Sequence, residues 1–543
     1  MKFFQHIVLV LLFVNLVACS ETGRVIDYPV VEKTNTNALE LYRVEVSDTA
    51  TILQMALYNR PGEFALLSSE VSLMGKTTGK TYRLTNVSGC ELGKKIIMPA
   101  SGCCWVTLQF EPVSPKDKLI DFISLKDNWD LRLEGIHLKP IEQPRNTFEC
   151  VLEGEVKDWP ECSRLLLTEA CKQDVARQYS IPVVDGKFRY TLRDSVNRLY
   201  QLCSWHDYMN NGFYPVDFIS EKGKIHFKLY NGDAVETSGI QSDSPLNKEL
   251  QHVKEGSIMD PLFSKRRQLM QDKQYYLSEI HALKDRVDQE SDESIREQLM
   301  EDGRAYFEKG DGMTEQARSL EKEINESFQK EKERNIAYIR THPTLVGLCL
   351  YKYWLFREIG IFKSQPSLSN IPMFEEIFEN LYKEQYASHP YIKEIGNNLA
   401  GLQLKKGDPF VDFVAPDVEG NSHRLSDLIQ GKYALLDLWS SWCSPCRAYS
   451  KLIIPTYETY KDKGFTVVGV AREANSTGPL EKVLQQDQYP WINLVDLNGQ
   501  VGVWEMYGET GAGGRFLIDP EGKILALDPL PEQVDKLLKE HLQ

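Results

Sequence analysis

A pair of cysteines near the C-terminus constrains this chain most, because it follows directly on a buried-strand pattern. Residues 433–439 are a run of apolar residues interrupted only by Asp437. Cys443 and Cys446 come next, with two residues between them, and a helix pattern then reaches about residue 463. The first amides of a helix are unpaired and its dipole is positive at that end, so both favour a thiolate over a thiol. We therefore expect a reactive sulfur where the strand turns into the helix.

The two sulfurs are expected to have different roles. Cys443 at the helix start is the attacking sulfur, and Cys446, one turn further in and more shielded, resolves the mixed disulfide that forms on Cys443. Strand alternation points Asp437 toward the interior beneath the pair, where burial would raise its pKa and let it accept and return the proton of Cys446. A strand-end Asp held by backbone hydrogen bonds is the competing interpretation. Trp442 is expected on the surface around Cys443, and Trp439 in the core.

A zinc site is the alternative interpretation of such a pair. It needs a second pair of ligands, and this part of the chain offers only His423 and His541, without suitable spacing. We therefore expect no metal. No cofactor is expected either, apart from the redox-active disulfide between Cys443 and Cys446.

The remaining pattern predicts a multidomain protein with N-terminal β domains, a central α-helical region and a C-terminal α/β fold. At 543 residues, 42% of them hydrophobic, the chain is too long for one core, and three or four domains are expected. The expected parts are a signal peptide (1–18), a β-rich domain (19–145), a second β domain (146–235), a helical domain (245–402) and the α/β domain (407–543).

The two β domains are predicted from short alternating stretches. In residues 25–139 they are separated by Gly, Pro, Asn and Ser, which is typical of antiparallel strands. Residues 148–231 repeat the pattern, and Asp185-Gly186 is expected at the turn of a hairpin.

The central region has apolar residues at spacings of three and four among many charged ones, which predicts helices. Asp260 is the expected cap of one of them, with Pro261 in its first turn. A coiled coil is the alternative, but breaks in the pattern and the aromatic residues at 351–356 favour a packed helical domain.

The C-terminal part alternates strands with helices, which predicts an α/β sheet with a mixed edge. The expected strands are 433–439, 465–470, 515–519 and 523–526, and the expected helices are 444–463, 480–488 and 531–542.

Charge excludes one class of partner. The formal net charge is −15, the isoelectric point is near 5.3, and no long run of Lys or Arg is present to neutralise a phosphate backbone. Nucleic acid is therefore not an expected partner.

The N-terminus has the pattern of a secretory signal. Residues 7–14 are apolar but too few to span a bilayer, and Ala18 precedes Cys19 as a small residue before the cut. The segment resembles the signals of bacterial lipoproteins, which implies that Cys19 is acylated and anchors the mature chain in a membrane. Ser20 and Glu21 lack the Asp that would retain it in the inner membrane, so the outer membrane is favoured. The alternative is an ordinary signal with a chance cysteine.

Eight further cysteines show no zinc spacing. Buried hydrophobic residues or structural disulfides are the favoured interpretations, and their pairing is left open. They are Cys90, Cys103, Cys104, Cys150, Cys162, Cys171, Cys203 and Cys349.

Five segments of the C-terminal part resemble periplasmic thioredoxin-like proteins of the TlpA/ResA type, related to the AhpC/TSA superfamily. They are residues 425–428, 431–439, 442–447, 463–470 and 516–524. The resemblance implies a thioredoxin fold and membrane-tethered disulfide reduction in the periplasm of a Gram-negative cell. Protein clients with disulfides or thiols, and a membrane electron-donor protein, are the partners it implies. Cys443 and Cys446 match the redox pair of the family.

Two departures from the family pattern stand near the cysteines. Gly513 occupies the place of a cis-proline, and because a cis bond without proline costs about 2.5–4 kcal/mol, we expect this loop to run trans. Lys451 replaces a proline that commonly kinks the active-site helix, and Pro455 follows a turn later. The residues expected to contact substrate are Trp442, Ser444, Pro445, Ala512 and Gly513.

Three functions are compatible with these patterns. A thiol-disulfide oxidoreductase that reduces or exchanges protein disulfides ranks first, with the direction of electron flow left open. A lipid-anchored binding scaffold with a redox-sensing thioredoxin domain is the alternative, because three quarters of the chain carries no recognisable chemistry. Peroxide reduction ranks last, since a peroxidatic cysteine requires a Thr three residues before it, and Cys443 has Ser440 at that position.

Overall fold

The computed structural model of the chain describes residues 23–36, 38–126, 129–139, 146–171, 177–209, 215–231, 238–255, 257, 259–290, 293–308 and 312–542. The chain forms two compact units, Met1–Gln143 and Pro144–Gln543. The expected signal peptide and Cys19 lie outside the described residues. Within the described part, no helix combines the length and the apolar character needed to cross a bilayer.

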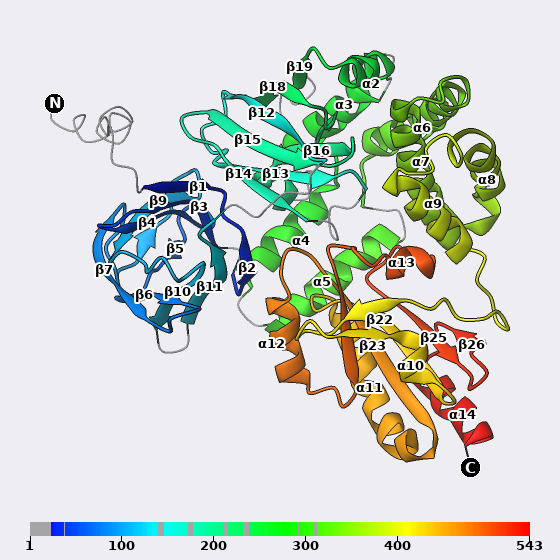
Figure 1. Ribbon diagram of the computed structural model, residues 1–543. Coiled ribbons are helices and arrows are strands. Elements are labelled where there is room, and N and C mark those ends of the chain that lie inside the picture. The colour runs from blue at the N-terminus through cyan, green and yellow to red at the C-terminus, as the bar shows by residue number, and fades with distance from the viewer. Residues whose placement is uncertain are drawn as a thin grey trace. The chain divides into compact units, whose positions relative to one another are not determined.

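The first unit is an antiparallel β structure, as the alternating pattern predicts (Figure 1). Its main sheet has the strand order β1-β3-β4-β9-β7-β6-β10-β11-β2, and β5 pairs with β8. Alternate side chains such as Leu73, Phe110 and Phe122 fill its core. The strands are β1 (Arg24–Asp27), β2 (Val31–Thr34), β3 (Leu39–Val46), β4 (Thr51–Tyr58), β5 (Phe64–Ala65), β6 (Glu70–Gly75), β7 (Thr81–Ser88), β8 (Ile96–Ile97), β9 (Cys103–Phe110), β10 (Leu119–Lys126) and β11 (Trp129–His137).

The second unit begins with two four-stranded sheets, β15-β12-β18-β19 and β14-β13-β16-β17. Both contribute to one core, Leu152 and Leu192 from the first sheet and Leu165 and Leu202 from the second. The elements are β12 (Phe148–Lys157), β13 (Arg164–Glu169), β14 (Tyr179–Pro182), β15 (Lys187–Asp194), β16 (Leu199–Ser204), α1 (Trp205–Met209), β17 (Val216–Ile219), β18 (Gly223–Tyr230) and β19 (Gly239–Ser242).

The expected Asp185-Gly186 turn forms, but it does not join neighbouring strands of one sheet. Both residues have positive φ, 50° and 67°, and Val184 and Lys187 form a single bridge across the turn. The flanking strands β14 and β15 belong to different sheets. The turn therefore connects two layers, because both sheets close over the same core.

Helices follow, as the spacing of apolar residues predicts. Helices α2, α6, α7, α8 and α9 pack around one core, and α3 packs with the first half of α6 in a second, smaller one. Tyr351 and Trp354 are buried in the larger core, whereas Phe356 is exposed. Helix α3 starts at Asp260 with Met259 as its N-cap, so the expectation that Asp260 is the cap is wrong. The helices are α2 (Pro245–Glu255), α3 (Asp260–Gln271), α4 (Ser278–Gln289), α5 (Glu293–Glu308), α6 (Glu315–Thr341), α7 (Leu345–Ser364), α8 (Ile371–Ile377) and α9 (Pro390–Gly401), with short turns at Pro366–Leu368 and Phe378–Tyr382.

The C-terminal part has a thioredoxin fold, which confirms the expected fold class. Its sheet has the order β24-β23-β22-β25-β26, with β22, β23 and β24 parallel and β25 and β26 antiparallel to their neighbours. Helices α11 and α14 pack on one face, and α10 and α13 on the other (Figure 1). The elements are β20 (Val414–Pro416), β21 (Ser422–Arg424), α10 (Leu425–Ile429), β22 (Tyr433–Trp439), α11 (Ser444–Tyr460), a short turn at Lys461–Lys463, β23 (Phe465–Glu473), α12 (Gly478–Asp487), β24 (Ile492–Leu497), α13 (Val503–Met506), β25 (Gly514–Ile518), β26 (Ile524–Leu527) and α14 (Pro531–His541).

Strand β24 and the short helices α10 and α13 were not expected from the sequence.

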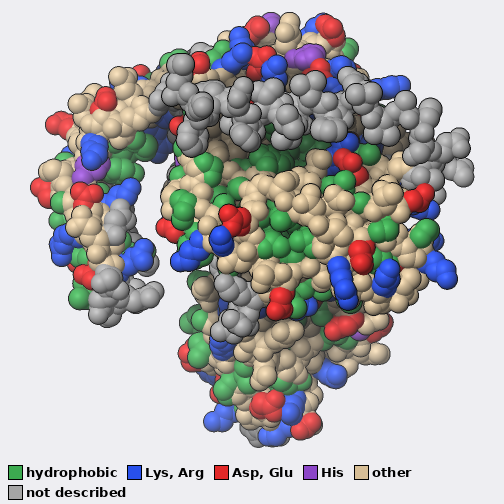
Figure 2. Space-filling view, turned by 90° about the vertical axis from the view of Figure 1, so that its left-hand side faces the viewer, with side chains coloured by type: hydrophobic (Ala, Val, Ile, Leu, Met, Phe, Trp, Pro, Cys, Tyr) green, Lys and Arg blue, Asp and Glu red, His purple; other side chains and the backbone are tan. Residues whose placement is uncertain are grey.

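Charged side chains on the surface are mixed in sign: on the face drawn in Figure 2, Lys and Arg are interspersed with Asp and Glu over the described residues. Such a surface has no broad positive field to attract a polyanion.

Candidate active site

Cys443 and Cys446 lie at the start of α11 and are joined by a disulfide, with their Cα atoms 5.3 Å apart. Cys443 is the N-cap residue, and its Sγ accepts a hydrogen bond from the backbone N–H of Cys446 at 3.2 Å. An amide that points at sulfur from the first helical turn is the contact that stabilises a thiolate. Both residues are buried, 7% and 5% exposed, so the expected difference in shielding is small.

The residues that flank the disulfide reach solvent. Trp442 is 55% exposed, and Ser444 and Pro445 are also exposed. Trp439 is buried instead, and its Nε1 donates to Oδ1 of Asn493 at 3.2 Å. The surface next to the buried sulfurs is therefore an aromatic side chain and an uncharged turn, as the sequence predicts for Trp442.

Asp437 is fully enclosed on β22. Its Oδ2 accepts a hydrogen bond from the hydroxyl of Ser450 at 2.7 Å, and the same hydroxyl lies 3.1 Å from the backbone oxygen of Cys446. Its Oδ1 has no hydrogen-bond partner, and Nε of Arg515 is 3.6 Å away. Burial raises the pKa of Asp437 to about 6, against the opposing effects of Ser450 and Arg515. A carboxyl of this kind exchanges a proton near neutral pH, as a general base must.

Gly513 lies against the redox pair, at the end of the loop before β25. A Cβ at this position would be 2.1 Å from the backbone oxygen of Leu438 and 3.3 Å from Sγ of Cys446, so only glycine fits without a backbone shift. No cis peptide bond occurs in the described residues, so the expected trans loop is confirmed. The backbone oxygen of Ala512 accepts from the hydroxyl of Ser440 at 3.2 Å. The structure thus brings both expected loop residues next to the cysteines.

Glu473 at the end of β23 is a site residue that the sequence reasoning missed. It is 3% exposed, and its two carboxylate oxygens accept from the backbone N–H and the hydroxyl of Ser441, each at 2.8 Å. Burial raises the pKa of Glu473, and the two hydrogen bonds from Ser441 lower it. These bonds fix the turn that precedes Cys443. The sequence signal that could have identified it is a glutamate at the end of an apolar run, since that run forms the strand next to β22.

The two departures in α11 have structural explanations. Lys451, in place of the family's proline, pairs with Asp487 at 2.9 Å, and Arg447 pairs with the same carboxylate at 2.7 Å. The hydrogen bond from Arg447 and the one from Lys451 hold the pKa of Asp487 well below its usual range. Pro455 lies inside the helix. The cation at 451 therefore fastens α11 to the end of α12.

The histidines considered as zinc ligands have other contacts. Nε2 of His423 lies 2.8 Å from Oδ2 of Asp417, and His541 stacks on Tyr433. Throughout the part of the chain that is described, no group of three or more His, Cys, Asp or Glu side chains is arranged to hold a metal ion.

The free thiols among the other eight cysteines considered above include Cys90, Cys104, Cys150, Cys162, Cys171, Cys203 and Cys349. Burial raises the pKa of several of them, to about 11 for Cys150 and about 12 for Cys162, Cys171 and Cys349. Ionisation of these thiols is therefore strongly disfavoured in the folded chain.

Comparison with known proteins gives consistent matches for the C-terminal part. The AhpC/TSA family model matches residues 406–527. The thiol-disulfide oxidoreductase ResA of Bacillus thuringiensis subsp. konkukian is 28% identical over 142 residues, which are 26% of this chain and 79% of the relative. ResA of Bacillus thuringiensis strain Al Hakam is 30% identical over 142 residues, 26% of this chain and 78% of the relative.

Solved structures match the same region. The thioredoxin domain of a thiol-disulfide oxidoreductase from Bacteroides vulgatus is 31% identical and covers 26% of this chain and 100% of that domain, with a TM-score of 0.24. A thiol:disulfide interchange protein from a Bacteroides species is also 31% identical, covers 26% of this chain and 91% of that protein, and has a TM-score of 0.24. With a ResA relative matched over most of its length, the chain belongs to the ResA family of thiol-disulfide oxidoreductases.

Proposed function

We propose that this oxidoreductase reduces or exchanges disulfides of protein clients in the cell envelope, with Cys443 and Cys446 as its working pair. One observation carries the proposal: Cys443 caps α11, and its Sγ accepts a hydrogen bond from the backbone N–H of Cys446 in the first helical turn. The exposed Trp442 beside it supports a protein substrate, because an aromatic surface next to a recessed sulfur suits an extended peptide.

The proposed reaction moves two electrons and two protons. The thiolate of reduced Cys443 attacks one sulfur of the client disulfide, a mixed disulfide forms, and the client's other sulfur leaves and takes up a proton. Asp437 then accepts the proton of Cys446. The Cys446 thiolate attacks Cys443, the second client sulfur leaves as a thiolate and is protonated, and Cys443 and Cys446 end as a disulfide. A dithiol donor reduces that disulfide for the next cycle.

Reduction of insulin with dithiothreitol as the donor tests the proposal. The full chain should precipitate insulin faster than dithiothreitol alone, and Cys443→Ser should return the rate to that background. A Cys446→Ala chain should accumulate mixed disulfides with clients in cells, because the resolving sulfur is absent. Equal insulin rates for the native chain and Cys443→Ser would reject the function.

Location is a separate part of the proposal. The signal pattern that ends in Ala18-Cys19 supports a lipid anchor at Cys19 in the outer membrane, with the folded chain facing the periplasm. Metabolic labelling with a palmitate analogue should mark the native chain and not Cys19→Ser. Recovery of label on Cys19→Ser, or of the native chain in a membrane-free fraction, would contradict it.

A further inference from the structure

Two central helices contact the loop that leads to the redox pair. Nζ of Lys363, in the last turn of α7, lies 2.7 Å from Oε2 of Glu509. The Glu509 side chain is only 11% exposed, and that of Lys363 is 32% exposed. The ion pair is therefore shielded from solvent on its acidic side, where a charge interaction is stronger than on an open surface.

A contact between two glycines lies beside this ion pair. A Cβ at Gly401, the last residue of α9, would be 2.3 Å from the backbone nitrogen of Gly508, and a Cβ at Gly508 would be 2.6 Å from the backbone carbon of Gly401. Gly508 also has φ +64°, a left-handed conformation that favours glycine. The two backbones therefore touch, which fixes where the 508–513 segment starts.

The same segment is held again before it reaches the disulfide. Nε1 of Trp504 and Nη2 of Arg472 both donate to the backbone oxygen of Gly511, at 3.1 and 3.0 Å. The Glu509 side chain covers Gly514, where a Cβ would come within 2.7 Å of its Cδ. The segment ends at Gly513, beside Cys446. Glu509 is thus only four residues before Gly513, whose backbone faces the sulfurs, so a displacement of Glu509 is expected to shift that backbone.

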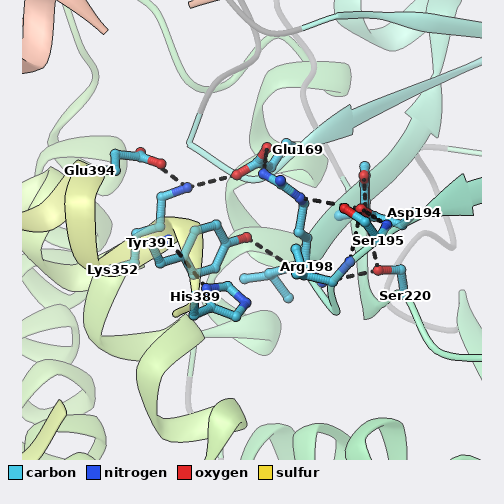
Figure 3. A network of polar contacts seen from close by, with 12 residues as sticks. Glu169, Asp194, Ser195, Arg198, Ser220, Lys352, His389, Tyr391 and Glu394 are labelled. Carbon is cyan, nitrogen blue, oxygen red and sulfur yellow. Dashed lines mark hydrogen bonds and ion pairs between the residues drawn. The ribbon is translucent and has the colours of Figure 1, made fainter. Parts of the chain in front are cut away.

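The two helices are themselves fixed to the sheets before them. Figure 3 shows Lys352 of α7 between Glu169 of β13 and Glu394 of α9, with Nζ–Oε1 distances of 2.9 and 3.1 Å. Nζ of Lys352 also lies 3.9 Å from the ring centre of Tyr391, whose hydroxyl accepts from the backbone N–H of Leu199 at 3.1 Å. Buried, fully paired contacts of this kind hold α7 and α9 in one place.

We propose that Lys363 and Glu509 are positioning residues, through which the central helices hold the 508–513 segment at the distance from the cysteines that a bound disulfide substrate needs. The inference rests on the proposed function. It assigns a specificity role to the helical region, which carries no redox chemistry. Substrate affinity depends on α7 and α9, whereas the reactivity of the two sulfurs depends only on the residues around them.

Substitutions in the full chain separate affinity from chemistry. We expect Lys363→Gln and Glu509→Gln each to raise KM for insulin about fivefold with kcat within about twofold, because a binding surface is loosened and no reacting group is lost. Amide hydrogen exchange of residues 509–513 should accelerate at least about tenfold. Lys363→Arg should keep both values native. Arg340→Gln, which removes the exposed Arg340–Glu376 pair of the same region, is the matched control and should change neither.

The two readouts distinguish this inference from the proposed function. Unchanged exchange of residues 509–513 in Lys363→Gln overturns the inference, whatever the activity. An equal loss of kcat in Lys363→Gln and Lys363→Arg also overturns it, since that pattern indicates general damage to the fold. If the native chain shows no Cys443-dependent insulin reduction but exchange accelerates as expected, the proposed function fails and the positioning contact stands.

Discussion

Two regions of the second unit bury charged groups, and they pair them differently. In the network around Lys352, the cation lies within 3.1 Å of two carboxylates, those of Glu169 and Glu394. At the redox site, Asp437 keeps one oxygen without a hydrogen bond, and its nearest cation, Nε of Arg515, is 3.6 Å away. One region pairs its buried charges at short distance, whereas the other leaves a buried acid incompletely paired.

The pKa values follow from this difference. Burial alone would lower the pKa of Lys352, but Glu169 and Glu394 reverse the effect and hold it above its ordinary value. Asp437 has no comparable compensation, so burial raises its pKa to about 6. The cation of the paired network is therefore held in its charged form and serves the fold. The incompletely paired acid can change its charge near neutral pH, which proton transfer requires.

Breaking the paired network should have the largest effect. Lys352→Met removes the buried cation that Glu169 and Glu394 share, and we expect the free energy of unfolding to fall by about 3–5 kcal/mol. Denaturant unfolding of the full chain, followed by circular dichroism, measures it. Lys383→Met removes the exposed Lys383–Glu379 pair and should cost less than about 1 kcal/mol. Similar losses in the two variants would contradict the contrast.

Removing the unpaired acid should stabilise the protein. Since the folded pKa of Asp437 is about 6 and its unfolded value is 3.8, the folded chain holds a proton that the unfolded chain releases between about pH 4 and 6. The free energy of unfolding therefore falls as pH rises through that window. We expect oxidised Asp437→Asn to be about 2–3 kcal/mol more stable than native at pH 7.5 and equal to it below pH 4. A variant less stable at pH 7.5 would refute this.

Removing the hydrogen bond to Asp437 should have a smaller effect. Ser450→Ala takes away the one hydroxyl that stabilises the carboxylate, so the pKa of Asp437 should rise further and stability at pH 8 should fall by about 1 kcal/mol. The pH dependence of unfolding measures both. In an Asp437→Asn background, Ser450→Ala should leave no pH-dependent difference, and a persistent one would assign the effect to another group.

The smallest effect is expected from the distant cation. Arg515→Gln removes a charge 3.6 Å from Oδ1 of Asp437, so the pKa of Asp437 should rise, but by less than in Ser450→Ala. The same pH series measures it. Arg424→Gln, which removes the exposed Arg424–Asp412 pair of the same domain, is the control. A fall in the pKa of Asp437 would show that Arg515 does not act on it by charge.

Local pattern was enough to predict most of the redox site. Strand β22 and the start of α11 follow from apolar periodicity and a cysteine at a helix start, and alternation is enough to bury Asp437. Gly513 was expected beside the cysteines because a family resemblance aligned it there. Glu473 was missed, since its burial depends on a partner, Ser441, that is 32 residues away in sequence.

Long-range pairing explains the other omissions. Lys352 stands in an apolar helix pattern that does not indicate its partner Glu169, 183 residues away in sequence. Asp185-Gly186 has the composition of a hairpin turn, but sheet assignment depends on which core the neighbouring strands bury. Strand β24 carries Asp496 among its apolar residues, and that carboxylate caps the start of α13 through backbone amides.

The buried free thiols described above have a consequence for an enzyme that exchanges disulfides. Burial disfavours the thiolates of Cys162 and Cys349, and both side chains are almost completely covered, so an attacking disulfide does not reach them. At these buried positions the folded enzyme is thereby protected from scrambling its own sulfurs. Unfolding removes this protection and exposes these thiols to disulfide exchange with neighbouring copies of the chain. We therefore expect an unfolded molecule to be lost by intermolecular cross-linking rather than refolded.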